Sequence, residues 1–183
     1  MSRKYWFLML LTPFLVAADQ GSKTVVENSF SHAARMDIIP GLLNLVYARN
    51  PGMAFGMLID LPETWRLPLF LGISVLAVLI IGHLFRQTAA KAVLMPAALA
   101  LILSGAIGNL TDRFRWGYVV DFIQMHWRQH YWPTFNVADS AISVGIALLI
   151  LDTLFTAEKP AAVPAPASAL SEAKPETDAS APR

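Results

Sequence analysis

The sequence predicts an all-α membrane protein: four transmembrane helices with a small β-like subdomain in the first loop. Of its 183 residues, 55% are hydrophobic and only 15% are charged, which is too apolar for an ordinary soluble domain. Three apolar runs, 67–85, 92–108 and 137–156, are long enough to cross a bilayer, and a shorter one lies near the N-terminus. This succession of runs favours one small polytopic domain.

Charge and cysteine content exclude several kinds of function. The net charge is +1 and no long run of basic residues occurs, so nucleic-acid binding has little support. Because the chain has no cysteine, it has no disulfides, thiol nucleophiles or thiolate metal ligands. The four histidines show no spacing typical of metal ligands, so we predict no metal and no other cofactor.

The first span is predicted over residues 5–22. Tyr5 to Ala18 carries no charge, but at about 1.5 Å per residue this run covers only roughly 21 Å of a core about 30 Å thick. Either the helix continues past Asp19, or the segment is a cleaved signal peptide with a basic start and small residues before the cut. The three later runs favour a retained span. Asp19 and Lys23 are four residues apart, the favourable order for a helical ion pair.

The first extramembrane loop is predicted over residues 23–65, which are too mixed in polarity to cross a bilayer. Residues 42–49 follow a Pro-Gly turn and indicate a short strand, and Asn50-Pro51-Gly52 indicates another turn. The apolar residues 53–58 then favour a segment that lies on the bilayer surface or against a bound apolar ligand. A small soluble subdomain with its own core is the alternative.

The remaining spans are predicted over residues 66–86, 92–113 and 137–156. Within the middle one of these, Ser104, Gly105 and Gly108 are small enough to let a neighbouring helix approach closely. The second loop, 114–136, is rich in aromatic residues of the kind found at membrane interfaces. Residues 157–183 are rich in Ala and Pro and are predicted to form a disordered cytoplasmic tail.

An even number of spans places both termini on one side of the membrane and loops 23–65 and 114–136 on the other. Most Lys and Arg residues of the folded part fall on the loop side, so a raw charge count does not settle the orientation. We place the termini in the cytoplasm because Arg3 and Lys4 flank the first span, and Arg86 and Lys91 occupy the shortest loop, where charge bias weighs most.

Polar side chains gather where the third span ends. Asn109, Asp112 and Arg113 are spaced three and four residues apart, so they share one face of a continuing helix. The helix dipole disfavours a carboxylate near a helix C-terminus, so Asp112 needs Arg113 or another cation beside it. Polar groups at this depth are costly and are usually functional.

Two carboxylates flank the second loop. Asp121 lies in an apolar run, where desolvation is expected to raise its pKa. Asp139 lies at the start of the fourth span, three residues after Asn136, a spacing typical of a helix cap. Such a cap, and a hydrogen bond from Arg113 or loop amides to Asp121, would account for each acid singly. They do not account for both acids meeting Asn109 and Arg113 at one depth.

Two close carboxyl groups that share one proton can hydrolyse a peptide bond without a thiol or a metal. One activates a water molecule and the other protonates the leaving amine. The dipole of the fourth span favours the ionised form of Asp139, whereas burial favours the protonated form of Asp121. We therefore predict that the shared proton lies mainly on Asp121, within a pair that titrates as a unit.

Five short motifs in this order, between four spans, resemble those of the lipoprotein signal peptidases (signal peptidase II), intramembrane aspartyl proteases of bacteria. The similarity covers roughly residues 5–156. The motifs are Asp19-Gln20-x-x-Lys23, Asn50-Pro51-Gly52-x-Ala54-Phe55, Gly105-Ala106-x-Gly108-Asn109-x-x-Asp112-Arg113, Val119-Val120-Asp121-Phe122 and Phe135-Asn136-Val137-Ala138-Asp139-Ser140.

The resemblance implies an aspartyl endopeptidase that removes signal peptides from diacylglyceryl-modified prolipoproteins, cutting before the lipidated cysteine. It implies a multi-pass protein of the bacterial cytoplasmic (inner) membrane, with the β-like subdomain and the active site near the periplasmic surface. It also implies membrane lipid as a partner and binding of cyclic peptide antibiotics such as globomycin. Asp121 and Asp139 would be catalytic; the supporting or substrate-binding residues would be Asp19, Lys23, Asn50, Asn109, Asp112, Arg113 and Asn136.

Two other classes of function remain open from the residues alone. A small transporter or proton-coupled channel would carry carboxylates near the middle of the membrane, whereas four of the acids here gather at one surface. Only Asp152 lies elsewhere, near the opposite end of the fourth span, and we expect its replacement to be nearly silent. A membrane scaffold without chemistry would leave the clustered polar residues without a purpose.

Overall fold

The computed structural model describes residues 2, 4–31, 34–52, 62–89 and 92–157. The apolar segment 53–58 and the predicted tail, apart from Ala157, lie outside these ranges. The helices are α1 (Lys4–Trp6), the π-helical turn η1 (Phe7–Leu11), α2 (Thr12–Ser29), α3 (Glu63–Gln87), α4 (Leu94–Trp116) and α5 (Val137–Ala157). The strands are β1 (Arg35–Ile39), β2 (Leu43–Asn50), β3 (Val119–Trp127) and β4 (His130–Tyr131).

Most of the described chain is helical, and its long helices are apolar. Within the described residues, three stretches have the length and hydropathy needed to cross a membrane: Thr64–Gln87, Leu94–Trp116 and Val137–Phe155. The segment α1, η1 and α2 runs without interruption from Lys4 to Ser29. Its last half carries Asp19, Lys23 and Glu27, which lower its mean hydropathy.

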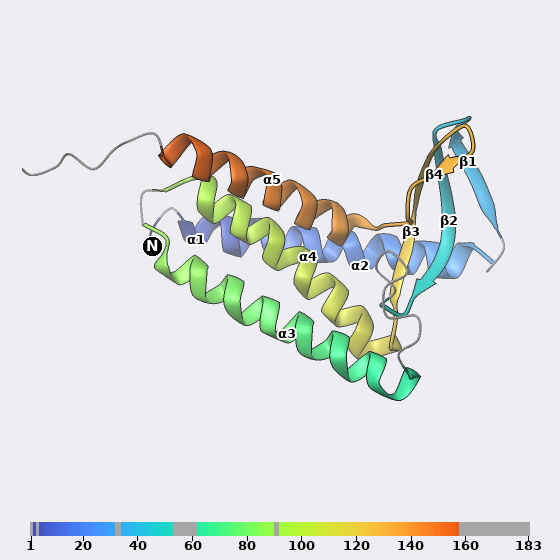
Figure 1. Ribbon diagram of the computed structural model, residues 1–183, viewed down its shortest axis with the longest axis horizontal. Coiled ribbons are helices and arrows are strands. Elements are labelled where there is room, and N and C mark those ends of the chain that lie inside the picture. The colour runs from blue at the N-terminus through green and yellow to red at the C-terminus, as the bar shows by residue number, and fades with distance from the viewer. Residues whose placement is uncertain (1, 3, 32–33, 53–61, 90–91, 158–183) are drawn as a thin grey trace, which may run out of the picture.

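Helix α4 is the centre of the bundle, and α2, α3 and α5 all pack against it (Figure 1). Helices α3 and α5 lie on either side of α4, and α3 packs mainly on α4. Gly117 caps the C-terminus of α4: its φ of 78° is left-handed, and its amide donates to the Arg113 carbonyl at 3.0 Å. Glycine adopts this conformation without the strain that a Cβ would introduce.

Glycines allow α4 and α5 to approach closely. A Cβ added to Gly145 would lie 2.6 Å from Ile102 Cγ1, and one added to Gly105 would overlap the Ala138 carbonyl oxygen. A Cβ at Gly108 would lie 2.6 Å from Asp19 Oδ2. The expectation that small residues near position 105 let a neighbouring helix approach is therefore confirmed.

The strands form one antiparallel sheet, in the order β1-β2-β3-β4, at one end of the bundle (Figure 1). The sequence prediction placed a β-like subdomain in the first loop, which supplies β1 and β2, and the sheet also takes in strands of the second loop. Strand β3 comes from the second loop, and it pairs with β2 through Leu45 opposite Ile123 and Ala48 opposite Asp121. A cluster of Val26, Tyr47, Val120 and Phe122 joins α2 to the sheet. The sheet thus carries Asp121 to the end of the helices.

Candidate active site

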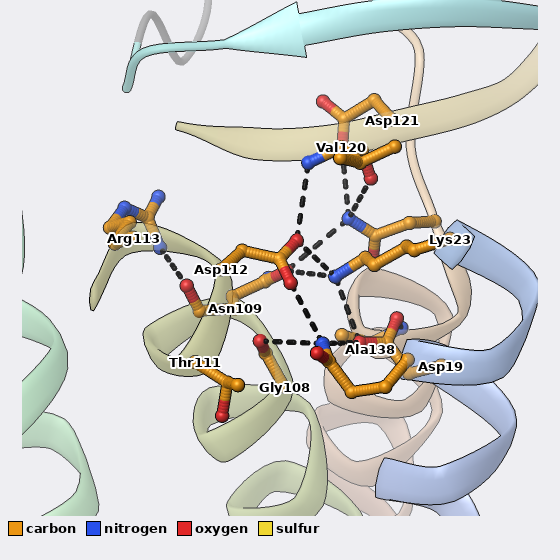
Figure 2. Close-up of polar contacts among 12 residues, drawn as sticks. Asp19, Lys23, Gly108, Asn109, Thr111, Asp112, Arg113, Val120, Asp121 and Ala138 are labelled. Carbon is orange, nitrogen blue, oxygen red and sulfur yellow. Dashed lines mark hydrogen bonds and ion pairs between the residues drawn. The ribbon is translucent and has the colours of Figure 1, made fainter. Parts of the chain in front are cut away.

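A buried lysine lies between two buried carboxylates at the sheet end of the bundle (Figure 2). The Lys23 ammonium is 2.8 Å from Asp19 Oδ2 and 2.8 Å from Asp112 Oδ2, and the three residues are at most 3% exposed. Burying these charges is costly, and only close pairing offsets the cost. The cation that compensates Asp112 is therefore Lys23, from α2, rather than its chain neighbour Arg113.

The same two carboxylates also anchor two other elements, α5 and β3. Asp19 Oδ1 accepts from the Ala138 amide at 2.9 Å, which satisfies a free donor in the first turn of α5. Asp112 Oδ2 accepts from the Val120 amide at 3.1 Å, and its Oδ1 accepts from Gln20 Nε2 at 2.7 Å. The cluster therefore holds α2, α4, β3 and α5 together.

Asp121 and Asp139 are reached by three asparagine amides. Asn50 Nδ2 donates to Asp121 Oδ2 at 3.0 Å and Asn136 Nδ2 donates to Asp121 Oδ1 at 2.8 Å. Asn109 Nδ2 donates to Asp139 Oδ1 at 2.8 Å. Asn136 also donates to Asn109 Oδ1 at 3.2 Å, so the two acids belong to one hydrogen-bonded group.

Each of these amides is oriented by a donor on its oxygen. Lys23, which can only donate, lies 3.2 Å from Asn109 Oδ1. The Gly52 amide donates to Asn50 Oδ1 and the Asp139 amide donates to Asn136 Oδ1, both at 2.9 Å. With the oxygen so occupied, the NH₂ of each asparagine faces a carboxylate. The Asn-Pro-Gly turn and the buried lysine thus act on the two acids through amide orientation.

Asp139 and Asn136 form the predicted helix cap. The Asn136 amide donates to Asp139 Oδ2 at 3.2 Å, and the Asp139 amide donates back to the Asn136 side chain. This reciprocal cap fixes Asp139 in the first turn of α5.

Burial, with a smaller contribution from the nearby charge of Asp139, raises the pKa of Asp121 to about 7, although the Asn50 and Asn136 donors oppose the shift. Asp121 is 1% exposed. Its carboxyl group therefore holds or releases a proton near neutral pH, which suits acid–base chemistry. The expectation that desolvation raises the pKa of Asp121 is confirmed.

Arg113 lies at the edge of this group. Its guanidinium lies 5.6 Å from the centre of the Phe70 ring of α3, and Nη1 donates to the Asn109 carbonyl at 3.3 Å. Within the described residues, no carboxylate pairs with Arg113 within 4.0 Å, and its buried Nε has no partner. Arg113 therefore connects this group to α3, and it interacts with Asp121 and Asp139 through its charge rather than through an ion pair in contact.

The structure places all nine candidate site residues at one end of the bundle. Gln20 also takes part, through its bond to Asp112, and Ser74 and Phe70 of α3 contact Arg113. Sequence reasoning assigned no role to these three; for Gln20 the neighbouring Asp19 was the available indication. Across the described ranges, no group of three or more His, Asp or Glu side chains is arranged to hold a metal ion.

A family model described as Signal peptidase (SPase) II, Peptidase_A8, matches residues 11–155. The chain belongs to the signal peptidase II family. It is 45% identical over 136 residues to the lipoprotein signal peptidase of Geobacter sulfurreducens, covering 74% of this chain and 84% of that protein. With the lipoprotein signal peptidase of Syntrophotalea carbinolica it shares 41% identity over 148 residues, which is 81% of this chain and 91% of that one.

The fold is also found in solved structures. A bacterial membrane enzyme determined at 2.3 Å resolution matches with a TM-score of 0.73 and 30% sequence identity, over 85% of this chain and 93% of that chain. The signal peptidase II match covers α2 to α5 almost completely. The lysine cluster, the three asparagines and both acids therefore lie inside the shared region.

Proposed function

We propose that this chain is an aspartyl endopeptidase that removes signal peptides from diacylglyceryl-modified prolipoproteins, cutting before the lipidated cysteine. Asp121 and Asp139 are the catalytic pair of this proposal. The observation that carries it is Asn136, which donates to Asp121 from its side chain and to Asp139 from its backbone. Two acids held by one residue, one of them with a pKa near 7, meet the needs of a shared-proton dyad.

The chemistry then follows from the two protonation states. From the described residues each acid accepts two N–H bonds, but only Asp139 lies at the positive end of a helix dipole. Ionised Asp139 takes a proton from water as the water oxygen attacks the scissile carbonyl carbon. Protonated Asp121 hydrogen-bonds the carbonyl oxygen. When the C–N bond breaks, the leaving amine receives a proton from the pair, and the two products separate.

The topology belongs to the same proposal. The continuous helical segment from Lys4 to Ser29 serves as a fourth span beside α3, α4 and α5, with both termini in the cytoplasm. The sheet and the dyad then lie at the periplasmic surface. In support, Asp19 and Lys23 are at the sheet end of this segment, whereas its apolar half runs away from the sheet (Figure 1).

Substrate enters sideways from the bilayer, between α3 and α5 and across α4. Asp139 lies on α5, and Arg113 reaches from α4 to Phe70 of α3, so the site is bordered by both flanking helices. An acylated cysteine can then keep its lipid chains in the membrane while the peptide bond reaches the dyad. Globomycin, a cyclic peptide, would occupy the same opening and compete with the substrate.

The test is cleavage of a purified, lipid-modified prolipoprotein by the purified protein in detergent, with release of the signal peptide followed by mass spectrometry. The expected cut is immediately before the modified cysteine, and addition of globomycin should stop it. The same precursor without its lipid serves as the matched substrate control. No cleavage of the lipidated precursor by correctly folded protein, or cleavage at scattered positions, would refute the proposal.

A further inference from the structure

A cavity lies at the end of the bundle opposite the dyad. It has a volume of about 450 Å³ and is formed by the end of α3, the start of α4 and the end of α5. Leu84, Met95, Leu99 and Leu149 supply apolar walls, and among the described residues that line the cavity Asp152 is the one with a charged side chain. Asp152 is half-buried, and no residue in the described part of the chain forms an ion pair or hydrogen bond with its carboxylate.

The cavity and the dyad open on the same face of α4. Met95 lines the cavity and Arg113 borders the dyad, and they are 113 − 95 = 18 residues apart on α4. Eighteen residues are five full turns of about 3.6 residues each, so the two side chains leave α4 in the same direction. Helices α3 and α5 lie on either side of α4 (Figure 1), so a substrate that lay along this face of α4 would meet both sites.

The distance between these two sites along the bundle matches a signal peptide. Asp139 and Asp152 are 152 − 139 = 13 residues apart on α5, which is roughly 20 Å along the helix axis. The apolar core of a signal peptide has about 7–15 residues and would span roughly 10–22 Å as a helix. Its n-region, before this core, carries Lys or Arg. A substrate cut at the dyad thus has its basic end near Asp152.

We propose that the Asp152 cavity receives a Lys or Arg of the signal peptide's n-region, so that Asp152 sets substrate affinity from the far end of the bundle. This inference rests on the proposed function, and it reverses the expectation from sequence that Asp152 is silent. The apolar walls accept the methylene stem of such a side chain, while the carboxylate pairs with its charge.

Lys4, a cation at this end of the bundle, is already engaged by other groups. Lys4 Nζ donates to the carbonyl oxygens of Arg86 at 3.0 Å and Thr88 at 2.6 Å, and so caps the C-terminus of α3. The Lys4 ammonium therefore hydrogen-bonds carbonyl oxygens at the end of α3 and does not pair with Asp152. An amine headgroup of a phospholipid would satisfy the same carboxylate, and the experiment must separate it from the n-region.

The experiment compares Asp152→Asn with the unchanged enzyme on two lipidated precursors, one with its natural basic n-region and one with those residues replaced by Gln. Assays are run in a non-ionic detergent, so that no lipid amine competes. For the basic precursor, Asp152→Asn should raise KM about two- to fivefold, the range of a partly solvated ion pair, and leave kcat unchanged. For the Gln precursor the two enzymes should have equal KM. Asp37→Asn, which removes an exposed carboxyl on β1, is the matched control.

A charge exchange completes the test: Asp152→Lys should cleave a precursor with Glu in its n-region at lower KM than it cleaves the basic one. An equal rise in KM for basic and Gln precursors, or a rise seen only when phosphatidylethanolamine is added, would overturn the inference in favour of a structural or lipid-binding role. Identical KM values for Asp152→Asn and the unchanged enzyme would also overturn it. In all of these outcomes the unchanged enzyme still cleaves the precursor, so failure of this inference would leave the proposed function intact.

Discussion

Asn136 and Asp139 cap each other: the backbone amide of each donates to a side-chain oxygen of the other, at 3.2 and 2.9 Å. A cap of this kind stabilises a helix N-terminus in any protein. Here the same bonds also turn the Asn136 NH₂ toward Asp121, 2.8 Å away. The cap therefore has two effects. It stabilises the start of α5, and it places Asp139 in the same hydrogen-bonded group as Asp121.

Replacing either acid by asparagine should abolish turnover while the protein still folds. Asp121→Asn and Asp139→Asn each remove half of a pair that must both take up and release a proton, so kcat should fall by about 10²–10⁴-fold or more. Cleavage of lipidated precursor, normalised to correctly folded protein, is the measurement. Binding of globomycin to both variants serves as the control for an intact site. Substantial turnover in either variant would exclude the aspartyl mechanism.

The stability of the protein should depend on pH through Asp121. Burial raises its pKa from 3.8 to about 7 in the folded state. Between these values the folded state binds more protons than the unfolded state, so stability falls as pH rises and levels off above about 7. Asp121→Asn has no such dependence. The substitution also changes a hydrogen bond, which shifts Tm by a similar amount at every pH. The difference in Tm, variant minus wild type, should therefore increase from pH 4 to pH 8.

Thermal unfolding in detergent across this pH range measures the effect, with Asp37→Asn as an exposed control. A pH-independent difference would show that Asp121 ionises normally in the folded protein. The same pKa predicts that turnover decreases as pH rises through about 7, because the pair then loses its shared proton.

The orientation can be checked by single cysteines, since the chain contains none of its own. In the proposed topology Phe30→Cys and Met125→Cys lie on the periplasmic side, and Thr88→Cys and Ala165→Cys lie on the cytoplasmic side. An impermeant thiol reagent added to intact spheroplasts should label the first two only, and permeabilised cells should allow labelling of all four. Labelling of the second pair from outside would invert the topology.

The sequence predicts the parts of this site that depend on local spacing. The apolar runs, the small residues around Gly105, the cap at Asn136 and the Asp19–Lys23 pair all follow from patterns within a few residues. Contacts between distant segments do not. The sequence predicts a loop where the structure has β3, because the strand that pairs with it, β2, is distant in the chain. Asn50, at the end of β2, is 71 positions from Asp121, to which it donates a hydrogen bond.

The partner of Asp112 was beyond sequence reasoning for the same reason. Arg113 is its neighbour in the chain, but consecutive helical side chains point about 100° apart. Lys23 comes instead from α2, where it lies 2.8 Å from Asp112 Oδ2. Such pairs depend on which face of each helix packs against its neighbour, and this is determined by the packing of the whole bundle rather than by local sequence.

Loss of Lys23 should be costly. Lys23→Met leaves the Asp19 and Asp112 carboxylates buried together without a cation, which should lower the free energy of unfolding by about 3–5 kcal/mol. It also frees Asn109 to rotate away from Asp139, so activity should fall with stability. Neutralising the two acids as well, in Lys23→Met with Asp19→Asn and Asp112→Asn, should recover part of the stability. The exposed pair of Arg35 and Asp37 is the matched control, because Asp37→Asn should cost less than about 1 kcal/mol.

The close contact of α4 and α5 leads to a final prediction. A Cβ at Gly145 would lie 2.6 Å from Ile102 Cγ1 and 2.8 Å from the Ala98 carbonyl oxygen, and a backbone atom cannot move aside as a side chain can. Gly145→Ala should therefore push the helices apart and destabilise the protein by about 1–3 kcal/mol. Gly82, on α3, would meet nothing within 4 Å, so Gly82→Ala should be neutral or slightly stabilising. Because α5 carries Asp139 and α4 carries Asn109, Gly145→Ala should also reduce kcat at temperatures where it remains folded. Equal Tm values for the two alanine variants would mean that α5 does not pack on α4 as closely as the structure places it.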